Sequence, residues 1–315
     1  MTMNYPRYLH TKQTVDDRAL NKDVLHALRA NLAQHPAEVP LRVIEVGAGI
    51  GTMLSRLLRW GLFPPQVDYI LLDAMPENIQ HAQIEIPRWA AEHSWQPFPL
   101  SEEEVLLESH HQTIICHFLC ADLFDYIEQQ PLPAHLLIAH AVLDLLPMPE
   151  SLQKMMRLLF PNGLAWLTLN FDGVTIFEPE LSLMDLQLSE TKNPLSMPVD
   201  AYLTNLYHQT MHTRPGGGDS QTGRHLFSHI TQSNAEILAA GASDWLVYPQ
   251  DGAYPAEEAY FLHCILDFFE ESLSQHPEVA PNLLGKWLQK RRAQIDAAEL
   301  VYIAHQMDFL VRRRA

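Results

Sequence analysis

Three glycines at alternate positions, Gly47, Gly49 and Gly51, are the feature that most restricts the fold of this chain. They stand between a run rich in β-branched residues, 41–46, and a run with helical periodicity, 52–60. Glycines at such a junction let the backbone turn sharply and let a ligand approach without a Cβ in the way. The following helix presents unpaired N–H groups at its start. The sequence therefore predicts a ligand-binding loop between a strand and a helix, and the alternative is a glycine-rich turn without a ligand.

Strands and helices alternate around this loop. The apolar pattern predicts strands over 41–46, 67–72, 113–119, 134–140 and 164–169, and helices over 14–34, 52–60, 76–93 (broken near Pro87) and 149–160. The acidic run 97–111 predicts a surface loop with a short helix. Alternation of this kind is typical of a parallel sheet covered by helices on both faces.

The regular pattern ends near residue 170. Several prolines and the run Gly216–Gly218 predict an insertion over 171–223 with one or two helices and a flexible loop. Beyond it the pattern predicts a helix, a strand, two helices and a last strand, over 228–240, 244–248, 256–274, 283–297 and 299–311.

Carboxylates follow the predicted strands at the edge where a ligand would lie. Glu45, two residues before the first glycine, is well placed to hold an ammonium group. Asp73 ends the second strand and can accept both hydroxyls of a ribose, or serve as a turn or helix-cap residue before Pro76. Asp122 ends the third strand and can accept from an adenine amino group while Leu123 packs on the ring, or cap the next helix.

The spacing of the glycines argues against a dinucleotide. That fingerprint has the form G-x-G-x-x-G/A, whereas here the third glycine, Gly51, comes one position early. The spacing therefore disfavours binding of a pyrophosphate.

The glycine loop and the two acids, in this order on successive strands, resemble class I S-adenosylmethionine-dependent methyltransferases, best over 43–169. The stretch 138–143 is similar to the fourth-strand motif of that family, and Pro161–Gly163 to its turn before strand five. The resemblance implies that 45–51 bind the methionine part, that Asp73 binds the ribose and that Asp122 binds the adenine end. The implied cofactor-binding residues are Glu45, Gly47, Ala48, Gly49, Gly51, Asp73, Ala74, Met75, Asp122, Leu123, His140 and Ala141.

The resemblance also implies the fold. It is an α/β, doubly wound, seven-stranded sheet of order 3-2-1-4-5-7-6 with strand seven antiparallel. Strands six and seven are assigned to 244–248 and 299–311, with a helical cap after strand five and a helix pair between strands six and seven. The predicted parts are an N-terminal helical lid segment (1–40), a Rossmann-like cofactor-binding core (41–170), a cap (171–227) and a C-terminal completion of the sheet (228–315).

The expected reaction is transfer of a methyl group by in-line displacement from S-adenosyl-L-methionine to an oxygen or nitrogen atom of a small molecule, leaving S-adenosyl-L-homocysteine. The alternatives are an NAD-dependent oxidoreductase, a non-catalytic cofactor-binding module, and an aminopropyl transferase using the decarboxylated cofactor. In open α/β sheets the site lies at the carboxyl ends of the strands. His140 is therefore expected beside the methyl group, as a base or merely packed there. The residues expected near the acceptor are Asn170, Asp172, His225, His229 and Tyr248, with residues 5–8 as a lid.

The composition restricts partners and location. A formal net charge of −17 disfavours nucleic acid and anionic membranes as partners. There is no signal-peptide pattern and no apolar run of about 18–20 residues that could span a membrane. Cys116, Cys120 and Cys264 show no disulfide spacing, so a cytoplasmic protein is expected, with Cys116 and Cys120 as core thiols. The pairs His208/His212 and His225/His229 lack a third ligand, so no metal is expected; the oligomeric state stays open.

Overall fold

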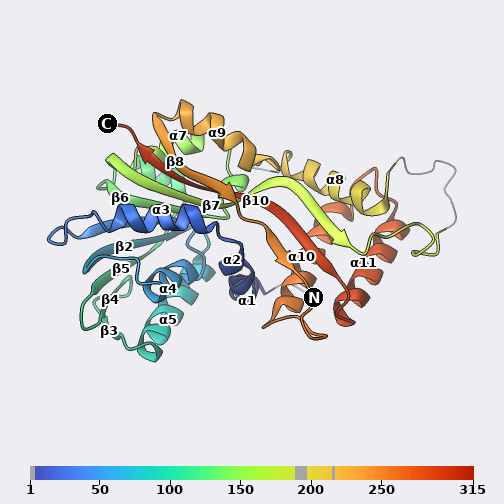
Figure 1. Ribbon diagram of the computed structural model, residues 1–315, viewed down its shortest axis with the longest axis horizontal. Helices are drawn as coiled ribbons and strands as arrows, with labels where there is room; N and C mark the ends of the chain where they lie inside the picture. Colours follow the sequence, from blue (N-terminus) through green and yellow to red (C-terminus); the bar gives the residue numbers. More distant parts are fainter. Residues whose placement is uncertain (1–3, 189–196, 215–216) are drawn as a thin grey trace.

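The computed structural model describes residues 4–188, 197–214 and 217–315. Over these residues the chain forms one mixed sheet of ten strands (Figure 1). The strands are β1 (Leu41–Val46), β2 (Gln66–Asp73), β3 (Gln96–Pro99), β4 (Glu104–Glu108), β5 (Thr113–Cys120), β6 (Ala134–His140), β7 (Leu159–Glu178), β8 (Ala235–Ala242), β9 (Trp245–Val247) and β10 (Val301–Arg313).

Helices cover both faces of this sheet. They are α1 (Tyr5–Thr11), α2 (Gln13–Ala19), α3 (Lys22–Leu32), α4 (Thr52–Arg59), α5 (Pro76–Glu92), α6 (Leu123–Glu128), the short 3₁₀ helix η1 (Leu143–Leu145), α7 (Glu150–Met156), α8 (Val199–Met211), α9 (Thr222–Gln232), α10 (Glu258–Leu273) and α11 (Pro281–Asp296). Pro194, Pro215 and Gly216 of the predicted insertion lie outside the described residues.

The strands run in the order β3-β4-β5-β2-β1-β6-β7-β10-β8, and β9 pairs with another part of β10. Strands β5, β2, β1, β6 and β7 are parallel, whereas β10 is antiparallel to both β7 and β8. The first four predicted strands are confirmed as β1, β2, β5 and β6. The expected count of seven and the expected order of the whole sheet are not matched, although the run β5-β2-β1-β6-β7-β10 follows the expected path.

Two segments were assigned to the wrong type of structure. The expected surface loop 97–111 contains the hairpin β3–β4, because Val105 and Leu107 alternate into the core with the period of a strand. The expected helix 228–240 covers the end of α9 and most of β8. The alanine-rich run of β8 has helical propensity, but pairing with β10 overrides it. Strand six is therefore β8, and the segment expected for it, 244–248, forms only the three-residue strand β9.

Helix boundaries also differ from expectation. The helix expected over 14–34 is split into α2 and α3, because the Asn21 side chain accepts from the N–H groups of Asp23 and Val24 and begins a new helix. The expected break near Pro87 is absent: α5 continues through it, with Ile86 and Ala90 buried on either side.

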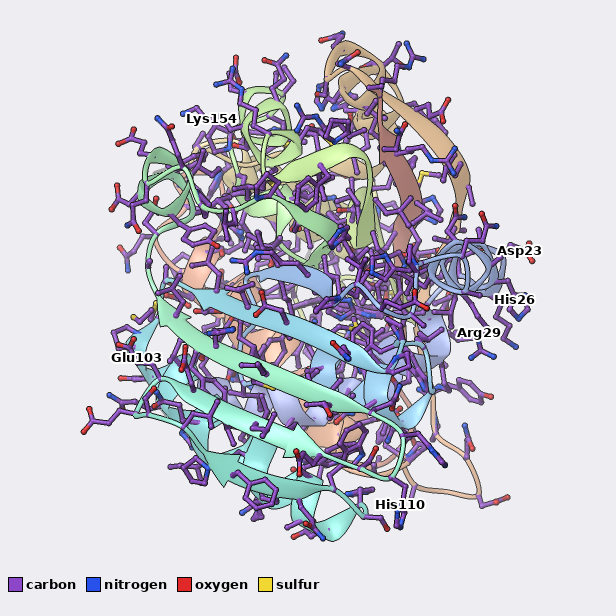
Figure 2. The ribbon with its side chains drawn as sticks, turned by 90° about the vertical axis from the view of Figure 1, so that its left-hand side faces the viewer. Asp23, His26, Arg29, Glu103, His110 and Lys154 are labelled. Atoms are coloured by element: carbon purple, nitrogen blue, oxygen red, sulfur yellow. The ribbon has the colours of Figure 1, made fainter. Side chains whose placement is uncertain are left out.

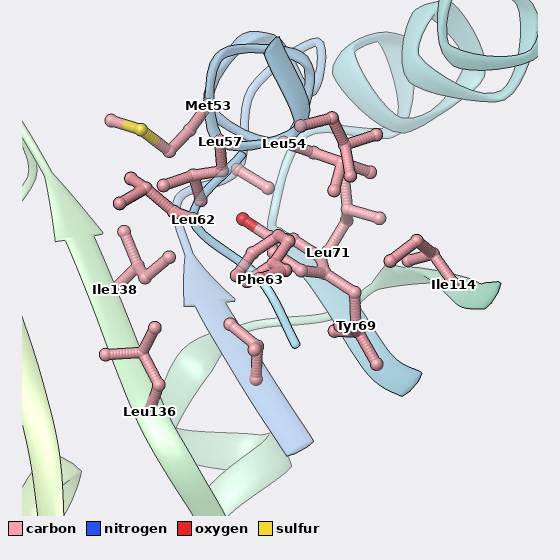
Figure 3. Packing of buried hydrophobic residues seen from close by; sticks show 14 of the residues in the cluster. Met53, Leu54, Leu57, Leu62, Phe63, Tyr69, Leu71, Ile114, Leu136 and Ile138 are labelled. Carbon is pink, nitrogen blue, oxygen red and sulfur yellow. The ribbon is translucent and has the colours of Figure 1, made fainter. Parts of the chain in front are cut away.

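The two faces of the sheet have separate cores. Leu41 and Val43 of β1 point to the side of α3, α4 and α5, whereas Ile44 and Val46 point to the side of α6, α7 and α9. Figure 3 shows the first core beneath the glycine loop, with side chains of α4 packed over β1, β2 and β6. Charged and polar side chains point outward. Figure 2 shows Asp23, His26 and Arg29 on the outer side of α3. It also shows Glu103 and His110 beyond the two ends of β4, and Lys154 on α7.

A second lobe extends the sheet beyond these cores. Strands β7 and β10 continue past the helices of the first part and, with β9, are covered by α8, α10 and α11 (Figure 1). Its core includes Phe177, Phe261, Phe269, Trp287 and Tyr302. The expected insertion and the expected helix pair therefore share one core. Cys264 is buried in this core and Cys116 in the first, whereas Cys120, expected as a core thiol, is exposed where β5 ends.

We expect Gly51→Ala to lower the free energy of unfolding more than Gly61→Ala does. Both positions have a left-handed backbone, with φ of +79° and +60°, which costs a residue with a Cβ about 1–2 kcal/mol. At Gly51 the new Cβ would also stand 2.5 Å from Ile86 Cδ1, whereas Gly61 faces open space. Urea denaturation of both variants measures the difference, and equal losses would contradict this packing role.

Candidate functional site

A cavity of about 590 Å³ lies at the carboxyl ends of β1, β2 and β6. It is lined by nearly all the residues expected to bind the cofactor: Glu45, Gly47, Ala48, Gly49, Asp73, Ala74, Met75, Asp122, Leu123, His140 and Ala141. Gly51 is the exception. Its left-handed turn serves the packing of the loop on α5 and β2 instead.

The glycine loop has a left-handed backbone at two of its positions. Gly47 and Gly49 have φ of +66° and +56°, values that residues with a Cβ rarely adopt. The Ala48 N–H donates to the carbonyl of Leu72 at 3.0 Å, which ties the loop to the end of β2. A Cβ on Gly49 would stand 3.0 Å from Leu9 Cδ1, so any side chain there would fill the space between the loop and α1.

Asp73 is a structural part of this loop. Its carboxylate accepts from the Gly49 N–H at 2.8 Å, from the Met75 N–H at 2.9 Å and from the Asn78 amide at 3.1 Å. A carboxylate offers about four acceptor positions, so one remains for a ligand. Asp73 can therefore accept from one ribose hydroxyl rather than both.

Asp122 is the N-cap of α6. One of its oxygens accepts from the N–H groups of Phe124 and Asp125, at 2.7 and 3.3 Å. The cap alternative is therefore confirmed. Its other oxygen is not part of the cap, and the residue lines the cavity.

Glu45 is a buried acid in the cavity wall, 2% exposed. The hydroxyl of Tyr69 donates to its Oε2 at 2.8 Å. Burial raises the pKa of Glu45 to about 8, although the Tyr69 hydrogen bond and Arg56 oppose that rise. At neutral pH the group is mostly protonated, and a cation beside it would favour loss of that proton.

His140 lines the cavity, but protein groups occupy both its ring nitrogens. Its Nδ1 lies 2.7 Å from Thr168 Oγ1, and its Nε2 lies 3.1 Å from Asp16 and 3.2 Å from Arg56. Burial lowers its pKa to about 4, against the opposing influence of Asp16. These contacts favour the packed role for His140 and leave no free nitrogen for a base at neutral pH.

Asp16 connects this histidine to the N-terminal segment. Its carboxylate is 1% exposed. It contacts Lys12 at 3.2 Å and Arg56 at 3.3 Å, and it accepts from the indole N–H of Trp245 at 2.9 Å. Burial opposes its ionisation, but Lys12, His140 and Arg56 together lower its pKa. Sequence reasoning missed Asp16 and Arg56, because nothing in their local pattern marks two residues that meet only in the folded chain.

The other half of the cavity is lined mainly by aromatic side chains. We call it the aromatic chamber, and its members are Tyr5, Tyr8, Phe171, Tyr207, Trp245, Phe268, Phe269 and Tyr302. They come from α1, β7, α8, β9, α10 and β10, so sequence analysis could not group them. Within α1, the segment expected as a lid, Tyr8 packs edge-on against Phe268 with ring centroids 5.3 Å apart.

The residues expected near the acceptor do not line the cavity. Asn170 is turned into the sheet and donates to the Met307 carbonyl at 2.8 Å. Asp172 is paired with Arg224 at 2.9 Å, which fastens α9 to β7. His225 is paired with Asp219, His229 lies one turn further along α9, and Tyr248 is exposed beyond β9. Because β7 continues as a strand past residue 170, its polar side chains alternate away from the cavity.

Over the described ranges, no group of three histidine, cysteine, aspartate or glutamate side chains is arranged to hold a metal. No helix in the same part of the chain has the length and apolarity needed to cross a bilayer.

No protein-family model and no curated protein matches the chain. Solved structures do resemble it. A methyltransferase of uncertain function from Bacillus halodurans is 13% identical, with 91% of this chain and 99% of that chain covered and a TM-score of 0.46. An S-adenosylmethionine-dependent methyltransferase from Thiobacillus denitrificans, solved with S-adenosyl-L-homocysteine, is 12% identical, with 99% and 100% covered and a TM-score of 0.44.

A cyclopropane synthase from Mycobacterium tuberculosis is 11% identical, with 94% of this chain and 88% of that chain covered and a TM-score of 0.43. Methyltransferases, the family that the glycine motif resembles, are thus among the similar structures. All three TM-scores lie below 0.5.

We compare the free energy of unfolding of wild type with that of His140→Gln. The difference in favour of wild type should shrink as the pH falls from about 6.5 towards 4. The folded-state pKa of about 4 lies below the usual 6.5, so over that interval only the unfolded histidine takes up a proton, and wild type loses up to about 1.4 kcal/mol per pH unit. Urea denaturation at pH 7 and pH 5 measures this.

His117→Gln provides a control of opposite sign. The hydrogen bond to Asp68 raises the pKa of His117, despite its partial burial. The stability that His117 adds is therefore present at low pH, and it is lost as the pH rises through the pKa of His117 in the folded protein. Parallel pH curves for wild type and His140→Gln would show that His140 is not buried in its neutral form.

Proposed function

We propose that this protein is an S-adenosyl-L-methionine-dependent methyltransferase acting on an oxygen or nitrogen atom of a small molecule. One observation carries the proposal: a single cavity joins a glycine loop with its flanking acids to an aromatic chamber. The first half suits a nucleoside with an amino acid tail, and the second suits an apolar acceptor. A net charge of −17 supports a small molecule rather than nucleic acid or a membrane as the partner, and free cysteines fit a cytoplasmic location.

The residues of the first half, which we call the cofactor half, fit this cofactor. Glu45 would hold its ammonium group, the remaining acceptor position of Asp73 would take one ribose hydroxyl, and Asp122 with Leu123 would contact the adenine. The left-handed backbone at Gly47 and Gly49 keeps Cβ atoms out of the space where the methionine part would lie.

When bound, the cofactor supplies a methyl group that is already electrophilic. The chain then has to align the acceptor with that group and to exclude water. The aromatic side chains of α1, α8 and α10 would help to exclude water, because they line the cavity with apolar surface. His140 would contribute by fixing the end of β6, not by taking a proton.

The dinucleotide alternative meets a difficulty in the glycine spacing. Counted from Gly47, the fingerprint has its last glycine or alanine at position 52, for close packing of helix on strand, whereas this chain has Thr52 there and its third glycine one position earlier. A non-catalytic binding module and an aminopropyl transferase keep the same cofactor half and differ in the chemistry that follows.

We expect S-adenosylhomocysteine and S-adenosylmethionine to bind and to raise the melting temperature, because a ligand that binds only the folded state stabilises it. NAD⁺ at the same concentration serves as the comparison and should have no effect. Isothermal titration calorimetry and thermal shift measure both ligands. Stabilisation by NAD⁺ alone, or by neither class at millimolar concentration, would overturn the proposal.

We expect S-adenosylhomocysteine to bind more tightly as pH rises from about 6 to 8, with release of a proton. In the free protein the pKa of Glu45 is about 8; the ligand's ammonium group would lower it, so the proton leaves on binding. Calorimetry at pH 7 in buffers of different ionisation enthalpy counts the protons. Glu45→Gln, which can still accept from Tyr69, should bind more weakly and lose this proton release. Identical proton counts in both proteins would remove Glu45 from the ammonium site.

A further inference from the structure

The aromatic chamber holds few charged groups. Lys12 reaches it, but its ammonium is paired with Asp16 at 3.2 Å. Arg214, after α8, and Asp144, in η1 after β6, are the other charged side chains that line this part of the cavity. The surrounding wall consists of ring faces and edges, such as the stacked pair Tyr207 and Phe269 with centroids 4.1 Å apart.

Asp144 is the carboxylate in this wall, and its side chain forms no ion pair within 4.0 Å with any residue that the structure describes. Among the described residues, its ionised form is supported by its own backbone N–H and, at longer range, by Arg214 and Lys12, while Asp219 opposes it. Burial outweighs that support and raises the pKa of Asp144 to about 6. Tyr5 and Tyr207 line the same cavity, and the charge of Asp144 contributes to the raised pKa of both. A carboxylate in such surroundings gains from a ligand that brings a positive charge and N–H donors.

Asp144 also lies close to the cofactor half. It lines the same cavity as Asp73, and it follows Val142, whose side chain would stand 3.0 Å from a Cβ on Gly47. The charges of both Asp73 and Asp144 raise the pKa of Tyr5, after the larger effect of burial. A group held by Asp144 would therefore stand at the junction of the two halves. Arg214, by contrast, follows α8 and approaches the chamber from the second lobe.

A second unmatched acceptor lies in the same chamber. Gln306 of β10 is 2% exposed and lines the cavity, and its Oε1 has no hydrogen-bond partner among the described residues. Buried polar atoms without a partner are rare in folded proteins. Together with the aromatic rings, which attract cations to their faces, Gln306 and Asp144 make the chamber complementary to a donor-rich, positively charged group on an apolar body.

We propose that the aromatic chamber binds an apolar amine and that Asp144 is the residue that holds its ammonium group. The assignment rests on the proposed methyl transfer only in making this nitrogen the methyl acceptor. For that step the ammonium would first pass a proton to the Asp144 carboxylate, and the free amine would then form the new N–C bond as the bond from the methyl carbon to sulfur breaks and S-adenosylhomocysteine leaves. The binding itself needs no cofactor, so the two proposals can fail separately.

The test uses three matched probes that differ in one group: 2-phenylethylamine, 2-phenylethanol and 3-phenylpropanoate. Calorimetric titration of the full chain, with and without saturating S-adenosylhomocysteine, gives their affinities. We expect the amine to bind at least about tenfold more tightly than the alcohol, the usual size of one charge-assisted hydrogen bond, and the carboxylate to bind most weakly. Amine affinity should fall as pH drops through about 6, where Asp144 takes up a proton.

Asp144→Asn tests the residue itself. It should remove the preference for the amine over the alcohol and flatten the pH profile, while the alcohol binds as before. Glu150→Gln, which removes an equal charge from an exposed position at the start of α7, should behave as wild type. If Asp144→Asn does not fold, the pH profile of wild type with amine and alcohol still decides the matter.

Tighter binding of 3-phenylpropanoate, lost in Arg214→Gln, would overturn the assignment in favour of an anionic acceptor. Equal affinity for amine and alcohol, or no binding of any probe, would also overturn it. Binding of S-adenosylhomocysteine without the amine would leave the methyltransferase proposal standing, whereas binding of the amine without S-adenosylhomocysteine would leave only the amine site.

Discussion

A single buried carboxylate, Asp16, holds together the elements that enclose the cavity. It joins Lys12 of the N-terminal segment, Arg56 of α4, His140 at the end of β6 and Trp245 of β9. Removing one partner from a buried ion pair costs several kcal/mol, whereas the intact pair adds little net stability. The network therefore fixes the arrangement of these elements more than it adds stability. Around Asp16 only one arrangement lets α4, β6 and the second lobe meet. The glycine loop, in turn, depends on Asp73, which uses three acceptor positions on the protein and leaves one for a ligand.

The residues that line the glycine-loop side of the cavity could be predicted from the sequence because their signals are local. A strand, three glycines and a helix follow one another within twenty residues, and Glu45 and Asp73 stand at the ends of neighbouring parallel strands. Strands β1, β2 and β6 are buried on both faces over most of their length, whereas β5 is buried on one, and the apolar runs of all four predict them. Prediction failed where a distant partner decides the structure: β8 becomes a strand only by pairing with β10, and the hairpin β3–β4 only by pairing with β5.

The aromatic chamber could not be predicted either, because it too depends on partners that are distant in the sequence. Its aromatic side chains come from six elements spread over almost the whole chain, and they meet because β7 and β10 run unbroken from the first part of the sheet into the second lobe. Asn170 and Asp172 would face a ligand if the strand ended near residue 170. Since β7 continues to Glu178, those side chains serve the sheet and α9 instead, and of β7 it is Phe171, between them, that joins the chamber.

The second lobe shows that buried charge alone does not identify a functional site. Asp200 there pairs with Arg291 and accepts from the indole N–H of Trp287 at 2.7 Å, as Asp16 does with Arg56 and Trp245. It also accepts from the Leu181 backbone, which fastens the segment after β7 to α8 and α11. The chemistry of the two networks is the same, but none of the partners of Asp200 lines the cavity, whereas Lys12, His140 and Trp245 do. The difference lies in position: Asp200 joins elements within one core, while Asp16 joins elements whose side chains line the cavity.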